Sequence, residues 1–358
     1  MKLYANAEGV ISLKPQLLPK LDAKDIADAP QAEVKKPEVS SELSGNNEYD
    51  NTPPVQFTYQ GGLVIKNPVI YNIYLGDWSG ADKQQLIASI EQYSSDILKS
   101  EWMNILSEYQ YAGKGKYVKN FFIPNVDNEL NEPDIHAILQ NAIDNKVIPE
   151  DTGDINSYNI FMIYLDEKTG INDSGLEIYI CQPDNDNAFG YHSTFVSRNS
   201  KNIFYCIIPA LTDTCLDYSC KGGACSLKLS DTQIDRITQV SSHELAEVIT
   251  NPNEAGYFDV KSGNEIGDIC NAKTAKIKIG ENTWQVQKQY SKSQDDASNG
   301  NVKCVGGMSA TGVKPDSKAA QFVSSNSMFV AQAAYVVGVL GIVYMLYKIG
   351  KKKVVVAI

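Results

Sequence analysis

The segment SSHELAEVITNP, residues 241–252, places one histidine and two glutamates at helical spacing. His243 and Glu247 are four residues apart, so in a helix their side chains leave the same face, and Glu244 lies one residue further round. Imidazole nitrogens and carboxylate oxygens are both ligands of zinc. The spacing therefore indicates a metal site, which a helix at this position would assemble.

The order of these residues is that of the H-E-x-x-H helix of zinc metalloproteases, with Glu247 in place of the second histidine. In that motif the intervening glutamate is the general base toward water that the metal activates, and Glu244 takes this role here. The alternative interpretation is a solvated helix face, where glutamate pairs at this spacing usually lie.

Two carboxylates downstream are candidates for a further metal ligand. Glu265 lies 18 residues after Glu247, and Asp268 lies 21 after it. This order is similar to that of the gluzincins, in which a glutamate beyond the helix completes the zinc site. Glu265 would then be the ligand, and Asp268 would orient His243 through its second ring nitrogen. In the alternative arrangement, Asp268 is the ligand and Glu265 orients His243.

Other residues are candidates on weaker grounds. His192, in GYHSTF, is a third ligand or a hydrogen-bond donor to the transition state, and Tyr257 is an oxyanion donor or an ordinary core aromatic. His136 is assigned no role. Calcium usually takes about six to eight oxygen ligands, which argues against it beside His243, so zinc is the expected cofactor.

Composition excludes some classes of function. The chain has 358 residues, 43% hydrophobic and 21% charged, so it can bury a core. A net charge of −11 argues against nucleic-acid partners, because phosphate contacts need clustered Lys and Arg. With only three histidines, a polyhistidine metal site is excluded.

Periodicity predicts an α/β or α+β fold, with one mixed-sheet domain at residues 55–307 built around the zincin-like helix. The helix spans 230–250, with Ser230 as its cap and Asn251-Pro252 as its end. Further helices are expected at 81–109 and 133–145. Strands are expected as two short runs in 62–75, separated at Asn67-Pro68, and at 158–165, 177–181, 191–197 and 202–208, with a hairpin of 275–279 and 284–289.

Both ends of the chain differ from this domain. Residues 1–54 hold six of the fourteen prolines and predict a disordered arm. Phe329–Tyr347 carries no charged residue and is long enough to cross a membrane as a helix, and a lysine cluster follows it. We expect a linker at 308–327, a single transmembrane helix at 328–347 and a basic tail at 348–358.

The positive-inside rule places the basic tail in the cytosol and the rest of the chain on the other side of the membrane. A tail-anchored protein normally keeps its N-terminal domain cytosolic, so the orientation stays open. Ala334 and Gly338 form a small-xxx-small pair, a pattern compatible with helix dimers, and the oligomeric state is left open.

Seven cysteines favour an oxidised domain. They lack C-x-x-C pairs with a nearby histidine, so disulfides are a better interpretation than zinc binding. At least two disulfides are expected, one of them within Cys215–Cys225, with one thiol left over.

Five further segments form a pattern across residues 60–305. They are GGLVIKNPVIYNIYLGDWS (61–79), Cys181 with FGYHS (189–193), the pair Cys215 and Cys220, HELAEVITNPNEAGYF (243–258) and EIGDIC (265–270). Together they resemble the phosphate-induced protein/Exordium family. The resemblance implies an extracytoplasmic domain, associated in plants with cell-wall and growth responses. It also implies that the scaffold can exist without the metal site, because some plant members lack the histidine and glutamate of this helix.

Two functions are therefore expected from the sequence. The first is a membrane-anchored, zincin-like metallopeptidase acting on proteins or peptides, with Glu244 as base and His243, Glu247 and one of Glu265, Asp268 or His192 as zinc ligands. The alternative is a non-catalytic surface or virion membrane protein that uses the same scaffold for binding. Metal content discriminates between them.

Overall fold

The computed structural model describes residues 55–110, 112, 114–154, 156–183, 187–219, 232–296 and 302–308. The chain divides into two units, residues 1–315 and 316–358, and all described residues belong to the first. The expected arm, linker residues 309–327, transmembrane helix, basic tail, Cys220, Cys225 and Ser230 lie outside the described residues. None of the described helices is long and apolar enough to cross a membrane.

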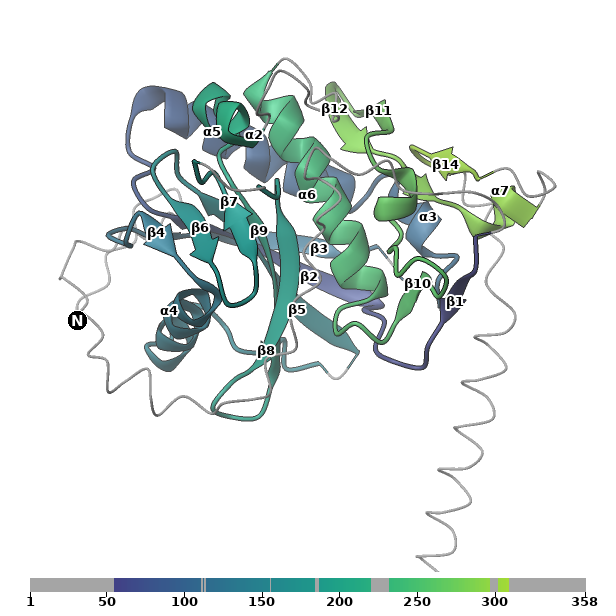
Figure 1. The fold of residues 1–358 in the computed structure, drawn as a ribbon, viewed down its shortest axis with the longest axis horizontal. Helices are drawn as coiled ribbons and strands as arrows, with labels where there is room; N and C mark the ends of the chain where they lie inside the picture. The colour runs from purple at the N-terminus through teal and green to yellow at the C-terminus, as the bar shows by residue number, and fades with distance from the viewer. Residues whose placement is uncertain are drawn as a thin grey trace, which may run out of the picture. The chain divides into compact units, whose positions relative to one another are not determined.

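The structure confirms a mixed α/β fold, organised around a five-stranded sheet (Figure 1). Its first four strands are parallel and its last strand is antiparallel to its neighbour. In sheet order they are β3 (Lys116–Ile123), β2 (Asn67–Leu75), β5 (Ser157–Leu165), β9 (Asn202–Ile208) and β8 (Tyr191–Val196).

The sheet is covered by helices on both faces. On one face, Ile135 and Leu139 of α4 (Glu132–Asp144) share an apolar cluster with sheet residues such as Ile163. On the other face, α2 (Ala81–Ile97) and α6 (Gln233–Thr250) pack side by side (Figure 1). Because strand side chains alternate between faces, His192 points to the α6 face while its neighbour Tyr191 joins the α4 cluster.

Two sequence expectations about the sheet and its helices are wrong. Residues 62–75 contain one strand instead of two, because only Asn67–Leu75, β2, is a strand. Pro68 is tolerated near the start of β2 because pairing with β3 begins only at Val69. The expected helix at 81–109 is divided into α2 and the short α3 (Met103–Leu106). Ser100 ends the first by donating its hydroxyl to the carbonyl of Ile97 at 2.6 Å.

The site helix α6 is fixed at both ends by local chemistry. Its N-cap is Thr232, whose Oγ1 accepts the backbone N–H of Asp235 at 3.3 Å, so the predicted cap at Ser230 is wrong. Asn251 ends the helix, and Pro252 follows. All residues from Ile237 to Thr250 are buried. This burial contradicts the interpretation of a solvated helix face.

A predicted hairpin, now β11 (Thr274–Ile279) and β12 (Asn282–Gln287), is confirmed and lies along α6. Ser242 Oγ accepts the backbone N–H of Gln287 at 2.8 Å, and Thr238 Oγ1 donates to the carbonyl of Gln285 at 2.7 Å. The hairpin therefore closes the side of α6 that the sheet does not cover.

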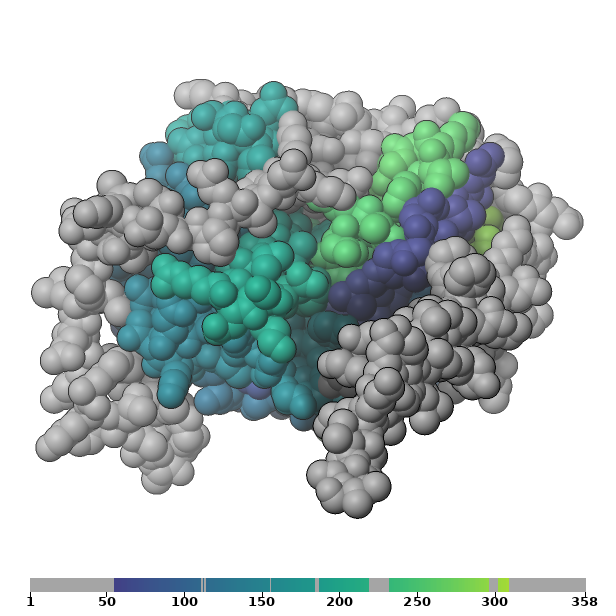
Figure 2. All heavy atoms as spheres, turned by 90° about the horizontal axis from the view of Figure 1, so that it is seen from below, coloured from purple at the N-terminus to yellow at the C-terminus, as the bar shows by residue number. Residues whose placement is uncertain are grey.

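The remaining elements are short. β1 (Phe57–Tyr59) pairs with β10 (Tyr257–Asp259), and Figure 2 shows these segments, purple and green, side by side although they are far apart in sequence. The others are β4 (Glu129–Leu130), β6 (Gly170–Asp173), β7 (Ile178–Ile180), β13 (Gln289–Tyr290), β14 (Cys304–Val305), α5 (Asp213–Ser219), α7 (Lys292–Asp296) and the 3-10 helix η3 (Asp268–Cys270).

Two disulfides are present among the described residues, which confirms the expected minimum. Cys181 is bonded to Cys215, and Cys270 to Cys304. Because Cys215 is bonded to Cys181, a disulfide within Cys215–Cys225 could only join Cys220 and Cys225, which lie outside the described residues. Cys206 is a buried free thiol.

Candidate metal centre

Six titratable side chains from α6, β8 and residues 265–268 meet in one buried cluster. His243, Glu244 and Glu247 come from α6 and His192 from β8, while Glu265 precedes η3 and Asp268 begins it. All six are buried, the most exposed being Asp268 at 6%. The structure thus brings together every histidine and carboxylate that the sequence analysis predicted for the metal site.

His243 and two carboxylates form one side of the cluster. His243 Nε2 lies 3.0 Å from Glu247 Oε1 and 3.4 Å from Asp268 Oδ1. Despite these distances, neither His243 Nε2 nor either oxygen of Glu247 makes a hydrogen bond within the described part of the chain. Two atoms bound to one tetrahedral zinc ion at about 2.0–2.2 Å lie about 3.3–3.6 Å apart. The 3.4 Å separation lies within this range and the 3.0 Å separation is slightly below it, so the three atoms could share a cation after a small displacement.

The other ring nitrogen of His243 is held by a residue that the sequence did not indicate. Gln287 Nε2 lies 2.6 Å from His243 Nδ1 and donates to the carbonyl of Gly267 at 2.8 Å. Asp268 approaches Nε2, so the arrangement in which Asp268 holds the second nitrogen is wrong. A glutamine in a strand gives no signal of this role, because the contact depends on how the hairpin packs on α6.

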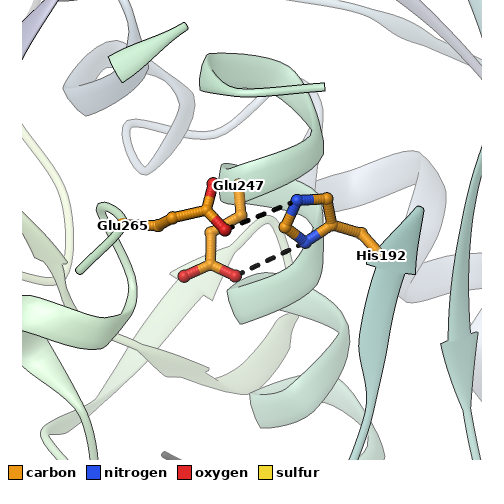
Figure 3. A group of neighbouring side chains, drawn as sticks. All are labelled: His192, Glu247 and Glu265. Atoms are coloured by element: carbon orange, nitrogen blue, oxygen red, sulfur yellow. Dashed lines mark ion pairs between the residues drawn. The ribbon is translucent and has the colours of Figure 1, made fainter. Parts of the chain in front are cut away.

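His192 forms the other side of the cluster. Its Nδ1 lies 3.4 Å from Glu244 Oε2 and 3.6 Å from Glu247 Oε2, and its Nε2 lies 3.6 Å from Glu265 Oε2. Figure 3 shows one ring nitrogen facing Glu247 and the other facing Glu265. Asn251 Nδ2 donates to Glu265 Oε1 at 2.7 Å and so orients this carboxylate.

Two glycines let backbone approach the cluster closely. A Cβ on Gly267 would lie 2.8 Å from both Glu247 Oε1 and His243 Nδ1. A Cβ on Gly190 would lie 3.1 Å from Glu244 Oε1 and 2.7 Å from Val240 Cγ1. Both glycines lie within the motifs FGYHS and EIGDIC, but the motifs alone do not indicate that backbone approaches the cluster at these two positions.

Two groups of this cluster could hold a metal ion: His192, Glu247 and Glu265, and His243, Glu244 and Glu247. In each group the ligand atoms lie within 4.8 Å of one another. Glu247 belongs to both groups.

The electrostatics of the cluster favour a cation. Burial, followed by the charge of Asp268, raises the pKa of Glu247, against the opposing effect of His243. Burial alone would lower the pKa of His243, but Glu247, Asp268 and Glu244 together hold that pKa well above its ordinary value. Crowded carboxylates must be relieved by a proton or a metal ion.

Tyr257 is placed in an aromatic cluster. Its ring contacts Phe57, Tyr59 and Tyr109, with centroids 5.9, 5.1 and 5.1 Å away. These contacts favour the core interpretation of this residue over the oxyanion donor. His136, which was assigned no role, lies on α4 and contacts Tyr205 OH at 2.9 Å.

Cys206 borders the cluster. It is the register partner of His192, and its thiol lies 3.7 Å from the carbonyl of Glu244. Burial, with the charges of Glu244 and Glu247, raises the pKa of this thiol well above its ordinary value. Cys206 is therefore a neutral thiol beside the site.

No protein-family model matches the chain, and no curated protein or solved structure is significantly similar to it. The likeness to the Exordium family stays a prediction from the sequence motifs.

Proposed function

We propose that the protein is a zinc-dependent hydrolase of the zincin type, acting on peptides or proteins. The observation that carries the proposal is the pairing of His243 Nε2 with Glu247 Oε1 at 3.0 Å, where neither atom has a hydrogen bond within the described residues. The i,i+4 spacing on α6 produces this pairing, and Asp268 adds a third donor atom 3.4 Å from the same nitrogen.

Each residue has a distinct role in this proposal. His243, Glu247 and Asp268 hold the ion, which when bound supplies a Lewis acid that polarises a carbonyl and activates water. Glu244 lies beside this set and accepts the proton of the attacking water. His192, 3.4 Å from Glu244, orients that carboxylate. Gln287 fixes the ring of His243.

The sequence motifs support placing this domain among Exordium-like proteins. Under this proposal it is anchored by the helix expected at 328–347, with most of the chain on the far side of the membrane or on a virion surface. The two disulfides are consistent with an oxidising compartment.

A second candidate is favoured by the burial of the cluster. The six side chains are at most 6% exposed, whereas a peptidase must admit a peptide to its metal. A metal ion enclosed in this way would stabilise a non-catalytic binding protein. Loss of hydrolysis without loss of stability in Glu244→Gln separates the two functions, because a purely structural site has no hydrolysis to lose.

Metal content and casein hydrolysis test the proposal. The purified protein should contain zinc, His243→Ala should lose it, and Glu244→Gln should keep zinc while losing hydrolysis of casein by about 100-fold or more. Glu108→Gln is the matched control, because Glu108 is a buried carboxylate outside the cluster that accepts from Ser291 at 2.9 Å. A protein that holds no zinc and gains no thermal stability from added zinc would overturn the proposal.

A further inference from the structure

We propose that the cluster binds two divalent metal ions, bridged by the carboxylate of Glu247. The inference rests on the proposed function only in that the cluster binds metal at all. It assigns a second ion, held by His192, Glu265 and Glu247, beside the ion held by His243, Asp268 and Glu247.

The two oxygens of Glu247 face different imidazoles. Oε1 lies 3.0 Å from His243 Nε2, and Oε2 lies 3.6 Å from His192 Nδ1. The side chain of Glu247 is fully buried, and neither oxygen makes a hydrogen bond within the described part of the chain. A buried carboxylate that leaves both oxygens without hydrogen bonds loses its hydration at a high cost. A bridge between two cations would satisfy both oxygens.

Each imidazole also faces a carboxylate that the other does not. Asp268 Oδ1 lies 3.4 Å from His243 Nε2, and Glu265 Oε2 lies 3.6 Å from His192 Nε2. Each candidate ion therefore has one imidazole and one carboxylate of its own, together with one oxygen of Glu247. The ligand atoms of His192, Glu247 and Glu265 lie within 4.8 Å of one another, close enough to surround an ion.

The two ring nitrogens of His192 can have different roles, one donating a hydrogen bond and the other binding the metal ion. Glu244 Oε2 lies 3.4 Å from Nδ1, so Glu244 can accept a hydrogen bond from a proton on Nδ1. The neutral ring then presents the lone pair of Nε2 on the side of Glu265. Glu247 Oε2 is nearer to Nδ1, and it would reach the same ion because one ligand atom each of His192, Glu247 and Glu265 lies within 4.8 Å of the others. Asn251 holds the other oxygen of Glu265 at 2.7 Å. A neighbour that fixes the tautomer in this way is usual for histidines that bind metals.

The charge of the cluster matches two divalent ions. Glu244, Glu247, Glu265 and Asp268 carry four negative charges when ionised, and each is at most 6% exposed. Two divalent ions would bring four positive charges, as many as there are carboxylates in the cluster. Because a buried charge without a partner of opposite sign is costly, this equality favours two ions over one.

The donor set defines the class of metal. Each ion would have one imidazole nitrogen and at least two carboxylate oxygens, a combination that suits zinc, manganese or iron in the divalent state. Calcium is disfavoured by the imidazoles. Zinc is therefore a suitable probe of stoichiometry, and manganese is a suitable probe of whether the two ions share a ligand.

The test is a metal titration of the full chain after removal of metal with a chelator. Calorimetry with Zn²⁺ should give two ions per chain for the wild type and for the control Glu108→Gln. Asp268→Asn and Glu265→Gln should each retain one ion, and Glu247→Gln should retain none at stoichiometric zinc. Electron paramagnetic resonance of the Mn²⁺-loaded wild type should show an exchange-coupled pair, which both single-site variants lose. Circular dichroism checks that each variant is folded.

The possible failures are distinguishable. One ion per chain, unaffected by Glu265→Gln, would overturn the second site and leave the proposed hydrolase intact. Two ions without magnetic coupling would overturn the bridging role of Glu247. A protein that binds neither Zn²⁺ nor Mn²⁺ would overturn this inference and the proposed function together.

Discussion

His243 presents its two ring nitrogens to different surroundings. Nε2 faces Glu247 and Asp268, and Nδ1 lies 2.6 Å from Gln287 Nε2. A neutral ring that binds metal through Nε2 carries its proton on Nδ1. The amide of Gln287 must then turn to present Oε1, the atom that makes no hydrogen bond within the described residues. Under the proposed function, metal binding and the orientation of this amide are therefore linked.

The first prediction concerns Gln287. Replacing it with methionine removes the hydrogen-bonding group beside His243 while keeping the size of the side chain, so zinc affinity should fall about 10–100-fold. Competition with a chromogenic chelator measures the change. Gln285→Met, two residues earlier on the same strand, is the control and should keep the wild-type affinity. Equal losses in both variants would indicate a general effect of the hairpin.

A second buried network lies on the opposite face of the sheet. Glu132 on α4 accepts from Tyr191 at 2.6 Å and from Tyr205, and lies 3.3 Å from His136 Nε2. Burial raises the pKa of Glu132, but these partners outweigh burial and hold the pKa below its usual value. The carboxylate is therefore stabilised in its charged form by folding.

This shift predicts a pH dependence. A carboxyl group with a depressed folded-state pKa contributes stability above its unfolded pKa, and the contribution is lost as pH falls through the folded value. Glu132→Gln should therefore lower the free energy of unfolding by about 1–3 kcal/mol at pH 7. The difference from wild type should shrink below about pH 4.5, the ordinary value for Glu. Urea unfolding at several pH values measures this, with exposed Glu129→Gln as the control.

At the scale of elements, the site depends on what holds η3 against α6. Asp268 begins η3, and the last residue of η3, Cys270, is bonded to Cys304 of β14. Gly267, just before η3, packs its backbone against Glu247 and His243. A displacement of η3 would therefore move Asp268 away from His243.

The two disulfides form a matched pair for the third prediction, because each joins cysteines 34 residues apart. By chain entropy, Ser substitutions of either pair should cost about 3–4 kcal/mol of stability. Only the Cys270/Cys304 variant should also lose metal affinity, because only that disulfide holds η3, which carries the proposed ligand Asp268. Thermal unfolding and metal titration measure both effects. An equal loss of affinity in the Cys181/Cys215 variant would assign the effect to general destabilisation.

At the scale of the whole molecule, residues 329–347 lead to a fourth prediction. Their charge-free composition predicts that the full chain stays with membranes after a carbonate wash, whereas a chain ending at Ser327 is released. Substituting two of these apolar residues with lysine in the full chain should also release it, because charges near the centre of a bilayer are costly. A truncated chain that still sediments with membranes would contradict the anchor.

Local chemistry explains what the sequence determined by itself. Helical spacing places His243, Glu244 and Glu247 in fixed relation to one another, whatever the rest of the fold does. Continuous apolar runs such as 158–165 and 202–208 predicted buried strands, because a strand that is covered on both faces has apolar side chains at nearly every position. The mixed α/β class followed from these local patterns.

Tertiary structure alone decided which distant groups meet at this helix. His192 reaches Glu244 across 52 residues because β8 lies at the end of the sheet under α6, and Gln287 reaches His243 across 44 because the hairpin packs on the other side. The partner of Cys215 and the side from which Asp268 approaches His243 were likewise set by packing. Such contacts depend on the folded path of the chain and on close approach at glycines, which no local pattern encodes.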